Sequence, residues 1–155
     1  DIRRWCSMAK HVYYLKDKGF SITIDDKALN AQLKRAFAAN PKETVKAARE
    51  CLLDLADISK ERAPLLSGDL RSDCTAVLNG TVIFTKQKPT GSAVSPKLSA
   101  FGAVGYSLPY SVRQHEELGY NHPLGGEAKF LERPFNENKA RYIKRFQRIV
   151  KDVVK

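Results

Sequence analysis

The sequence predicts an α+β fold in which long helices pack on one face of a small antiparallel β-sheet, and three observations support this. Two segments, 41–62 and about 134–153, place apolar residues at helical spacing along one side. Residues 20–24 alternate between apolar and polar, as a half-buried strand does. An Asn-Gly pair at 79–80, between two strand-like segments, is a strong hairpin signal. We therefore expect two or three helices on a sheet of about three to five strands, with an amphipathic C-terminal helix.

The N-terminal part is expected to hold a strand pair followed by a helix. Residues 12–15 are a second strand candidate beside 20–24. Asp25 or Asp26 offers a carboxylate that can cap the N-terminus of the next helix. That helix is predicted over 28–39, with an apolar face made by Leu29, Leu33, Ala36 and Phe37.

A second helix is predicted to begin directly after Asn40. The Asn40 side chain can cap it, Pro41 suits the first helical position, and Glu43 follows three residues after the cap. The helix should continue to about Arg62, because Pro64 disfavours helical backbone at the residue before it. Its buried stripe is expected to consist of Val45, Ala48, Leu52, Leu55, Ala56 and Ser59.

The remaining strands are predicted in the middle of the chain. Residues 72–78 and 81–86 flank the Asn-Gly turn, and 103–108 form another strand candidate. The segment 87–102 between them has no hydrophobic periodicity and is long for a connection inside a compact domain. We expect it to be a mobile loop that a partner orders.

The C-terminal third is expected to end in an amphipathic helix. Residues 110–118 are predicted to form a short helix, or a strand leading into one, and 119–126 a loop. The last helix is predicted over about 134–153. Its apolar side should consist of Tyr142, Ile143, Phe146, Ile149, Val150 and Val153.

Length and composition indicate one globular domain. A chain of 155 residues can bury one core, so we predict a single domain over 1–155, with 1–19 as an N-terminal extension or arm. Hydrophobic residues make up 43% and charged residues 28%, which argues against the disordered and membrane classes. The three cysteines, Cys6, Cys51 and Cys74, are odd in number and widely spaced, so we expect reduced thiols, the last two of them buried.

The formal net charge of +10 indicates either solvated basic faces or an acidic partner. Residues 127–155 hold nine lysines or arginines against four acids. A basic DNA-binding accessory protein is therefore an alternative function, although the chain has none of the sequence patterns of the common nucleic-acid-binding modules.

The residues that could carry chemistry do not form a catalytic or metal-binding pattern. His115, Glu116, Glu117 and His122 are close in sequence, but their spacing matches no zinc signature. Ser67 lacks the glycine context of a nucleophile elbow, and no phosphate-binding loop is present. We expect no catalysis, no cofactor and no metal.

Two groups of motifs, taken in order, resemble a known family. The first group consists of Ala63, Pro64, Ser67, Gly68, Leu70 and Arg71. The second consists of Tyr110, His115 and Glu116, then His122, Pro123 and Gly125, then Lys129, Phe130, Leu131 and Glu132. Over roughly 20–153 the chain resembles the neck, or tail-completion, proteins of tailed bacteriophages, also called head–tail joining proteins.

The resemblance implies a structural virion protein. It implies a homo-oligomeric ring of about six or twelve copies in the neck, between the head-completion or connector protein and the tail terminator or tail-tube protein. Phage DNA would pass through, no membrane would be involved, and assembly would take place in the bacterial cytoplasm.

Motif residues are expected to act mainly through architecture and through pairing between subunits. Gly68 should relax the backbone after the helix, and Leu70 and Phe130 should anchor on the core. The residues expected at interfaces are Arg71, Lys86, Lys88, Lys97, His115, Glu116, Lys129, Glu132 and Arg133.

Overall fold

A computed structural model describes residues 12–13, 22–24, 26–78, 81–85, 88–89 and 102–154. Several predictions lie outside these residues. They concern Cys6, the Asn79-Gly80 turn, Lys86 and Lys97, and most of the 87–102 loop.

The described strands form one antiparallel sheet of six strands. In spatial order they are β1 (Val12–Tyr13), β2 (Ile22–Ile24), β6 (Gly102–Tyr106), β3 (Thr75–Leu78), β4 (Thr81–Thr85) and β5 (Lys88–Pro89). The predicted strand pairing is confirmed for 12–13 with 22–24 and for the hairpin of β3 with β4.

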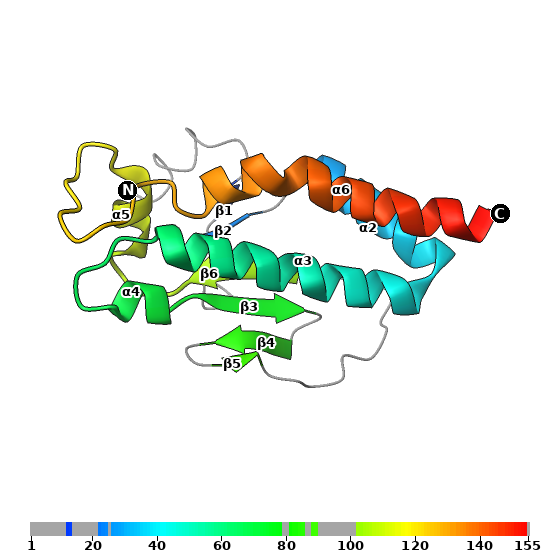
Figure 1. Ribbon diagram of the computed structural model, residues 1–155, viewed down its shortest axis with the longest axis horizontal. Helices are drawn as coiled ribbons and strands as arrows, with labels where there is room; N and C mark the ends of the chain where they lie inside the picture. The colour runs from blue at the N-terminus through cyan, green and yellow to red at the C-terminus, as the bar shows by residue number, and fades with distance from the viewer. Residues whose placement is uncertain are drawn as a thin grey trace.

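Three long helices form a layer over the sheet (Figure 1). They are α2 (Lys27–Ala39), α3 (Pro41–Arg62) and α6 (Glu132–Val154). α3 lies against β3, β4 and β6, while α2 and α6 pack on α3 and on each other. The predicted fold class, long helices on one face of a small antiparallel sheet with an amphipathic C-terminal helix, is confirmed. None of the described helices combines the length and the apolar character needed to cross a bilayer.

The helix boundaries follow the predicted caps. The Asp26 carboxylate accepts a hydrogen bond from the Leu29 amide at 2.9 Å, which caps α2. The Asn40 side chain accepts from the Glu43 amide at 3.2 Å and caps α3. The Asn40 amide also donates to the Ala36 carbonyl at 2.8 Å, so one residue ends α2 and begins α3. A single non-helical residue, Asn40, therefore turns the chain between two packed helices.

α3 and α6 run in opposite directions, and three ion pairs lie along their contact. From one end to the other the pairs are Arg62–Glu137, Asp54–Arg141 and Glu50–Arg145. All three pairs are partly or largely solvent-exposed, so water and salt screen them and each contributes little to stability. Their effect is to align the two helices rather than to hold them together.

The core lies between the helix layer and the sheet. Its stripe on α3 matches the predicted one: Val45, Ala48, Leu55, Ala56 and Ser59 are buried, and Leu52 packs against them. The Ser59 and Tyr106 hydroxyls share a buried hydrogen bond of 2.7 Å. Cys74 is fully buried as expected, and burial raises the pKa of its thiol to about 12. Cys51 is half-buried, and burial raises the pKa of its thiol to about 11.

The sheet has six strands instead of the expected three to five, three local features also differ from the sequence-based predictions, and one open alternative is decided. β3 begins at Thr75 instead of residue 72, because a one-turn helix, α4 (Asp69–Ser72), occupies the preceding residues. Part of the predicted 87–102 loop is regular, since Lys88–Pro89 forms the edge strand β5 beside β4. Residues 110–118 are resolved in favour of a helix, α5 (Ser111–Glu116). Val153 is 52% exposed, so the apolar side of α6 stops short of it.

Candidate functional site

The two motif groups, far apart in sequence, lie side by side at one end of the molecule. Two backbone hydrogen bonds join them, Leu65 N–H to Gly125 O (3.1 Å) and Glu127 N–H to Arg62 O (2.9 Å), and a third, Lys129 N–H to His115 O (2.7 Å), joins two parts of the second group. The residues that carry the family resemblance therefore build one structural unit.

The first motif forms the turn after α3. Gly68 has φ +89°, a left-handed conformation that glycine adopts without steric cost, and α4 begins at the next residue. Leu70 is 5% exposed and belongs to the core. The Arg71 Nε donates to the Ala63 carbonyl at 2.9 Å, which closes the turn. The predicted roles of Gly68 and Leu70 are confirmed.

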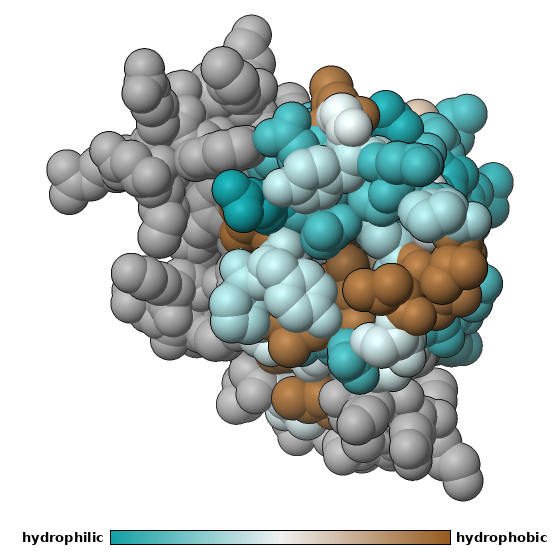
Figure 2. All heavy atoms as spheres, turned by 90° about the vertical axis from the view of Figure 1, so that its left-hand side faces the viewer, coloured by the Kyte–Doolittle hydropathy of each residue, from teal (hydrophilic) through white to brown (hydrophobic). Residues whose placement is uncertain are grey.

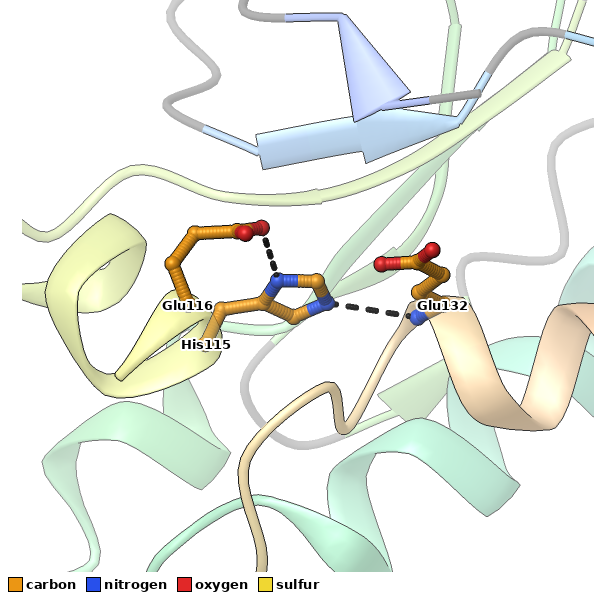
Figure 3. Close-up of side chains that lie close together, drawn as sticks. All are labelled: His115, Glu116 and Glu132. Carbon is orange, nitrogen blue, oxygen red and sulfur yellow. Dashed lines mark hydrogen bonds and ion pairs between the residues drawn. The ribbon is translucent and has the colours of Figure 1, made fainter. Parts of the chain in front are cut away.

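His115 is the centre of the second motif. Its side chain is fully buried, and its ring packs against Phe130 in a T-shaped arrangement with a centroid distance of 5.0 Å. The Nε2 atom accepts a hydrogen bond from the Glu132 amide at 3.3 Å, so the proton lies on Nδ1, which donates to Glu116 Oε1 at 2.7 Å (Figure 3). The imidazole thus connects α5 with the first turn of α6.

Lys129 completes this group, which we call the latch: His115, Glu116, Lys129 and Glu132. The Lys129 ammonium donates to Glu116 Oε2 and lies 3.0 Å from Glu132 Oε2. The side chains of Lys129, Glu116 and Glu132 are 18%, 5% and 20% exposed. Lys129 has φ +57°, an uncommon conformation for a residue with a Cβ atom. Two carboxylates therefore hold one lysine at a sharp bend of the chain.

In the latch, burial shifts each pKa in the direction that favours the uncharged form, while hydrogen bonds to the other members shift it in the direction that favours the charged form. Burial lowers the pKa of His115 below its ordinary 6.5, although the Glu116 carboxylate opposes this. Burial alone would raise the pKa of Glu116, but the hydrogen bonds from His115 and Lys129 outweigh it and the pKa is lowered. Burial likewise opposes the charge of Lys129, yet hydrogen bonds to Glu116 and Glu132 raise its pKa. At neutral pH the latch holds a neutral imidazole and a charged lysine between carboxylates.

We expect acid to weaken the fold through His115. Below pH 6.5 the unfolded chain protonates this imidazole while the folded chain does not, so the unfolding free energy falls as the pH falls through the depressed folded-state pKa. The slope from one such group is at most about 1.4 kcal/mol per pH unit. NMR titration of the His115 ring measures its pKa directly. A midpoint at or above 6.5 would contradict the expectation.

The latch does not have the properties of a metal site. Among the residues that the structure describes, ligand atoms of His115, Glu116 and Glu132 lie within 4.8 Å of one another, whereas Glu117 and His122 are not part of this group. The Lys129 ammonium already occupies the cationic position between the two carboxylates. The His115 Nε2 lone pair is used by the Glu132 amide. A metal ion would have to displace both.

Ser67 and His115 are engaged separately. The Ser67 hydroxyl donates to the Asp69 carboxylate at 2.6 Å, on the exposed turn before α4. Both ring nitrogens of His115 are occupied inside the latch. The two side chains therefore do not form a nucleophile and its base.

The residues predicted at subunit interfaces fall into different environments. His115 and Glu116 lie inside the subunit, so a direct interface role does not fit their burial. The charges expected to pair between subunits pair within the chain: Lys129 with Glu132, and Arg133 with Glu127 at 2.8 Å. These ion pairs form within one subunit because the bend at Lys129 brings the two ends of the second motif group close together. Arg71 is half-buried in its turn, Lys88 lies in β5, and Lys86 and Lys97 are outside the described residues.

Sequence reasoning missed a cluster of exposed apolar side chains above the latch, which we call the apolar end. Its members are Leu66 (86% exposed), Leu118 (68%), Leu124 (58%), Tyr110 (43%) and Tyr120 (37%). Figure 2 looks onto this end of the molecule and shows several groups of hydrophobic side chains separated by polar ones. Between the turn at 64–70 and the loop at 121–124 lies a hollow of about 330 Å³. The sequence signal for this cluster was the presence of leucines near glycines in predicted loops, where no hydrophobic periodicity assigns them to a buried face.

Comparisons with protein-family models, with curated proteins and with solved structures found no match to this chain.

Proposed function

We propose that this protein is a structural subunit of a tailed bacteriophage, forming a closed ring of about six or twelve copies in the virion neck. The ring would join the head-completion or connector protein to the tail terminator or tail-tube protein and let DNA pass. It would assemble in the bacterial cytoplasm and act without making or breaking a bond. The proposal rests on the family resemblance of the two motif groups.

The structural observation that best supports the proposal is that the motif residues build a rigid support for an exposed apolar surface. The polar groups of His115, Glu116 and Lys129 are engaged within the chain. The leucines of the apolar end project from the same unit. Contiguous exposed apolar side chains with polar surroundings are typical of protein interaction sites. This arrangement suits a protein that acts by fitting its neighbours.

Gene deletion in the encoding phage tests the proposal. We expect DNA-filled heads and free tails in the lysate, with no joined particles, and rescue when the intact gene is supplied in trans. Mass spectrometry of purified wild-type particles should detect the protein, and antibody labelling should place it at the neck. Infectious joined particles that lack the protein would contradict the proposal.

The alternative, a basic DNA-binding accessory protein, is favoured by the net charge of +10 and by the second half of α6, where residues 143–154 hold four lysines or arginines and one acid. It predicts tight binding to duplex DNA whose affinity falls steeply with salt, because bound counterions are released. The neck proposal predicts joined particles that depend on the protein even when variants no longer bind DNA. The two functions are separated by testing Lys144→Gln with Arg148→Gln for both DNA affinity and particle joining.

A further inference from the structure

The exposed apolar side chains and the charges of this molecule segregate to its two opposite ends. In Figure 1, α4, α5 and the loop that follows α5 form one tip, and the last turn of α6 lies at the other. Of the eight large apolar side chains that are exposed among the described residues, five form the apolar end. Val153 (52% exposed) and Val154 (82% exposed) lie on the last turn of α6, and Val82 lies on β4.

The two tips carry opposite charge. Segments 63–73 and 107–126, which build the apolar end, hold two arginines and no lysine against four acids. Segments 34–50 and 143–154, at the other tip, hold nine lysines or arginines against three acids. Eight of these nine basic side chains are exposed, the exception being the half-buried Arg49. Glu116 is already paired with Lys129 inside the latch, so three acids against two arginines leave this end weakly acidic in a protein with net charge +10.

We propose that the apolar end of one copy receives the last turn of α6, residues 151–154, from a second copy. The hollow between the turn at 64–70 and the loop at 121–124 would take Val153 and Val154, while Lys151 would face Asp69 and Glu117. This inference rests on the proposed ring and names the contact between its subunits.

The physical basis is complementarity in both shape and charge. The hollow is rigid, because the latch and the backbone bonds between 62–65 and 125–127 hold its two sides. The valines project from a helix end and lose little freedom on burial, since valine has a stiff side chain. Opposite charges orient the two tips before contact and disfavour like ends meeting. Because the two surfaces differ, the contact is heterologous and can close into a ring.

A pair of surface variants tests the proposal. Variant H carries Leu66→Arg and Leu124→Arg, which block the hollow. Variant T carries Val153→Asp and Val154→Asp, which block the tip of α6. All four side chains are exposed, so both variants should retain the circular dichroism spectrum and unfolding midpoint of the unaltered protein.

The expected result is monomers of each variant alone and one-to-one dimers when they are mixed. In the mixture, the intact tip of H can enter the intact hollow of T, and the dimer cannot extend further. The unaltered chain should form larger assemblies that dissociate as salt is raised. Native mass spectrometry measures the assembly state of each variant alone, of their mixture and of the unaltered chain. Val82→Arg, on β4 and away from both tips, is the matched control and should assemble like the unaltered protein.

Three outcomes would overturn the contact: variant T assembling like the unaltered chain, a mixture of H and T that stays monomeric, or an unaltered chain that stays monomeric at its solubility limit. A dimer of variant T alone would indicate that two apolar ends meet symmetrically instead. The contact and the proposed function can fail independently. Head-to-tail dimers of a protein absent from phage particles would refute the neck role alone.

Discussion

Replacing Gly126 with alanine is expected to lower the unfolding free energy by roughly 3–5 kcal/mol. Gly126 has φ +99°, and a Cβ atom there would lie 2.4 Å from the Pro64 Cα and 2.7 Å from the Ala63 carbonyl oxygen. Both of these are backbone atoms, so no side chain can rotate to relieve the contact. The Glu127 amide next to this position also donates to the Arg62 carbonyl, and pushing the segments apart would lose that bond. The change therefore separates the two halves of the unit that supports the apolar end.

Gly125→Ala is the matched control for this prediction. Gly125 has a similar backbone conformation, φ +104°, but a Cβ atom there meets nothing within 4 Å. Gly125→Ala should lower the unfolding free energy only by the cost of the backbone strain, about 1–3 kcal/mol. Urea unfolding followed by circular dichroism gives both free energies. If the two alanine variants are equally stable, Gly126 is not required for the close approach of the two backbone segments.

The helices could be predicted from sequence because their signals are local. Asn40 caps α3 with its own side chain, and the apolar stripe of α3 needs only the 3.6-residue period to be recognised. The strand alternation at 22–24 and the β3–β4 hairpin are local in the same sense. In each case the residues that decide the structure lie within a few positions of one another.

The unit that supports the apolar end could not be predicted in detail because its two halves come from distant segments of the chain. Leu65 bonds to Gly125 and Arg62 to Glu127, each across about 60 residues. The bend at Lys129, with φ +57°, could not be predicted because the position holds neither glycine nor asparagine, the residues that commonly adopt positive φ. His115 and Glu116 were recognised as motif residues, but a glutamate is rarely buried without a partner, so the burial of Glu116 was not expected. α4 was missed because a single helical turn has no period to detect.

Replacing Lys129 with methionine is expected to destabilise the fold by about 2–4 kcal/mol, because it leaves a buried carboxylate without its partner. The Glu116 side chain is 5% exposed and would keep only the His115 hydrogen bond. Methionine retains the length of the lysine stem and the same backbone requirement at φ +57°, so the change isolates the charge. The loss should be largest at neutral pH and shrink in acid, where Glu116 takes up a proton. Urea unfolding at several pH values measures it.

Arg133→Met is the control, because Arg133 also pairs with a glutamate at the start of α6 but is 48% exposed. That pair should contribute under about 1 kcal/mol. The double variant Glu116→Gln with Lys129→Met removes both buried charges of the closest pair, and it should be more stable than the sum of the single changes implies. Additive losses would mean that Lys129 acts by filling space. If instead the charge is what matters, the same pairing explains how one exposed loop stays rigid enough to present its leucines to a partner.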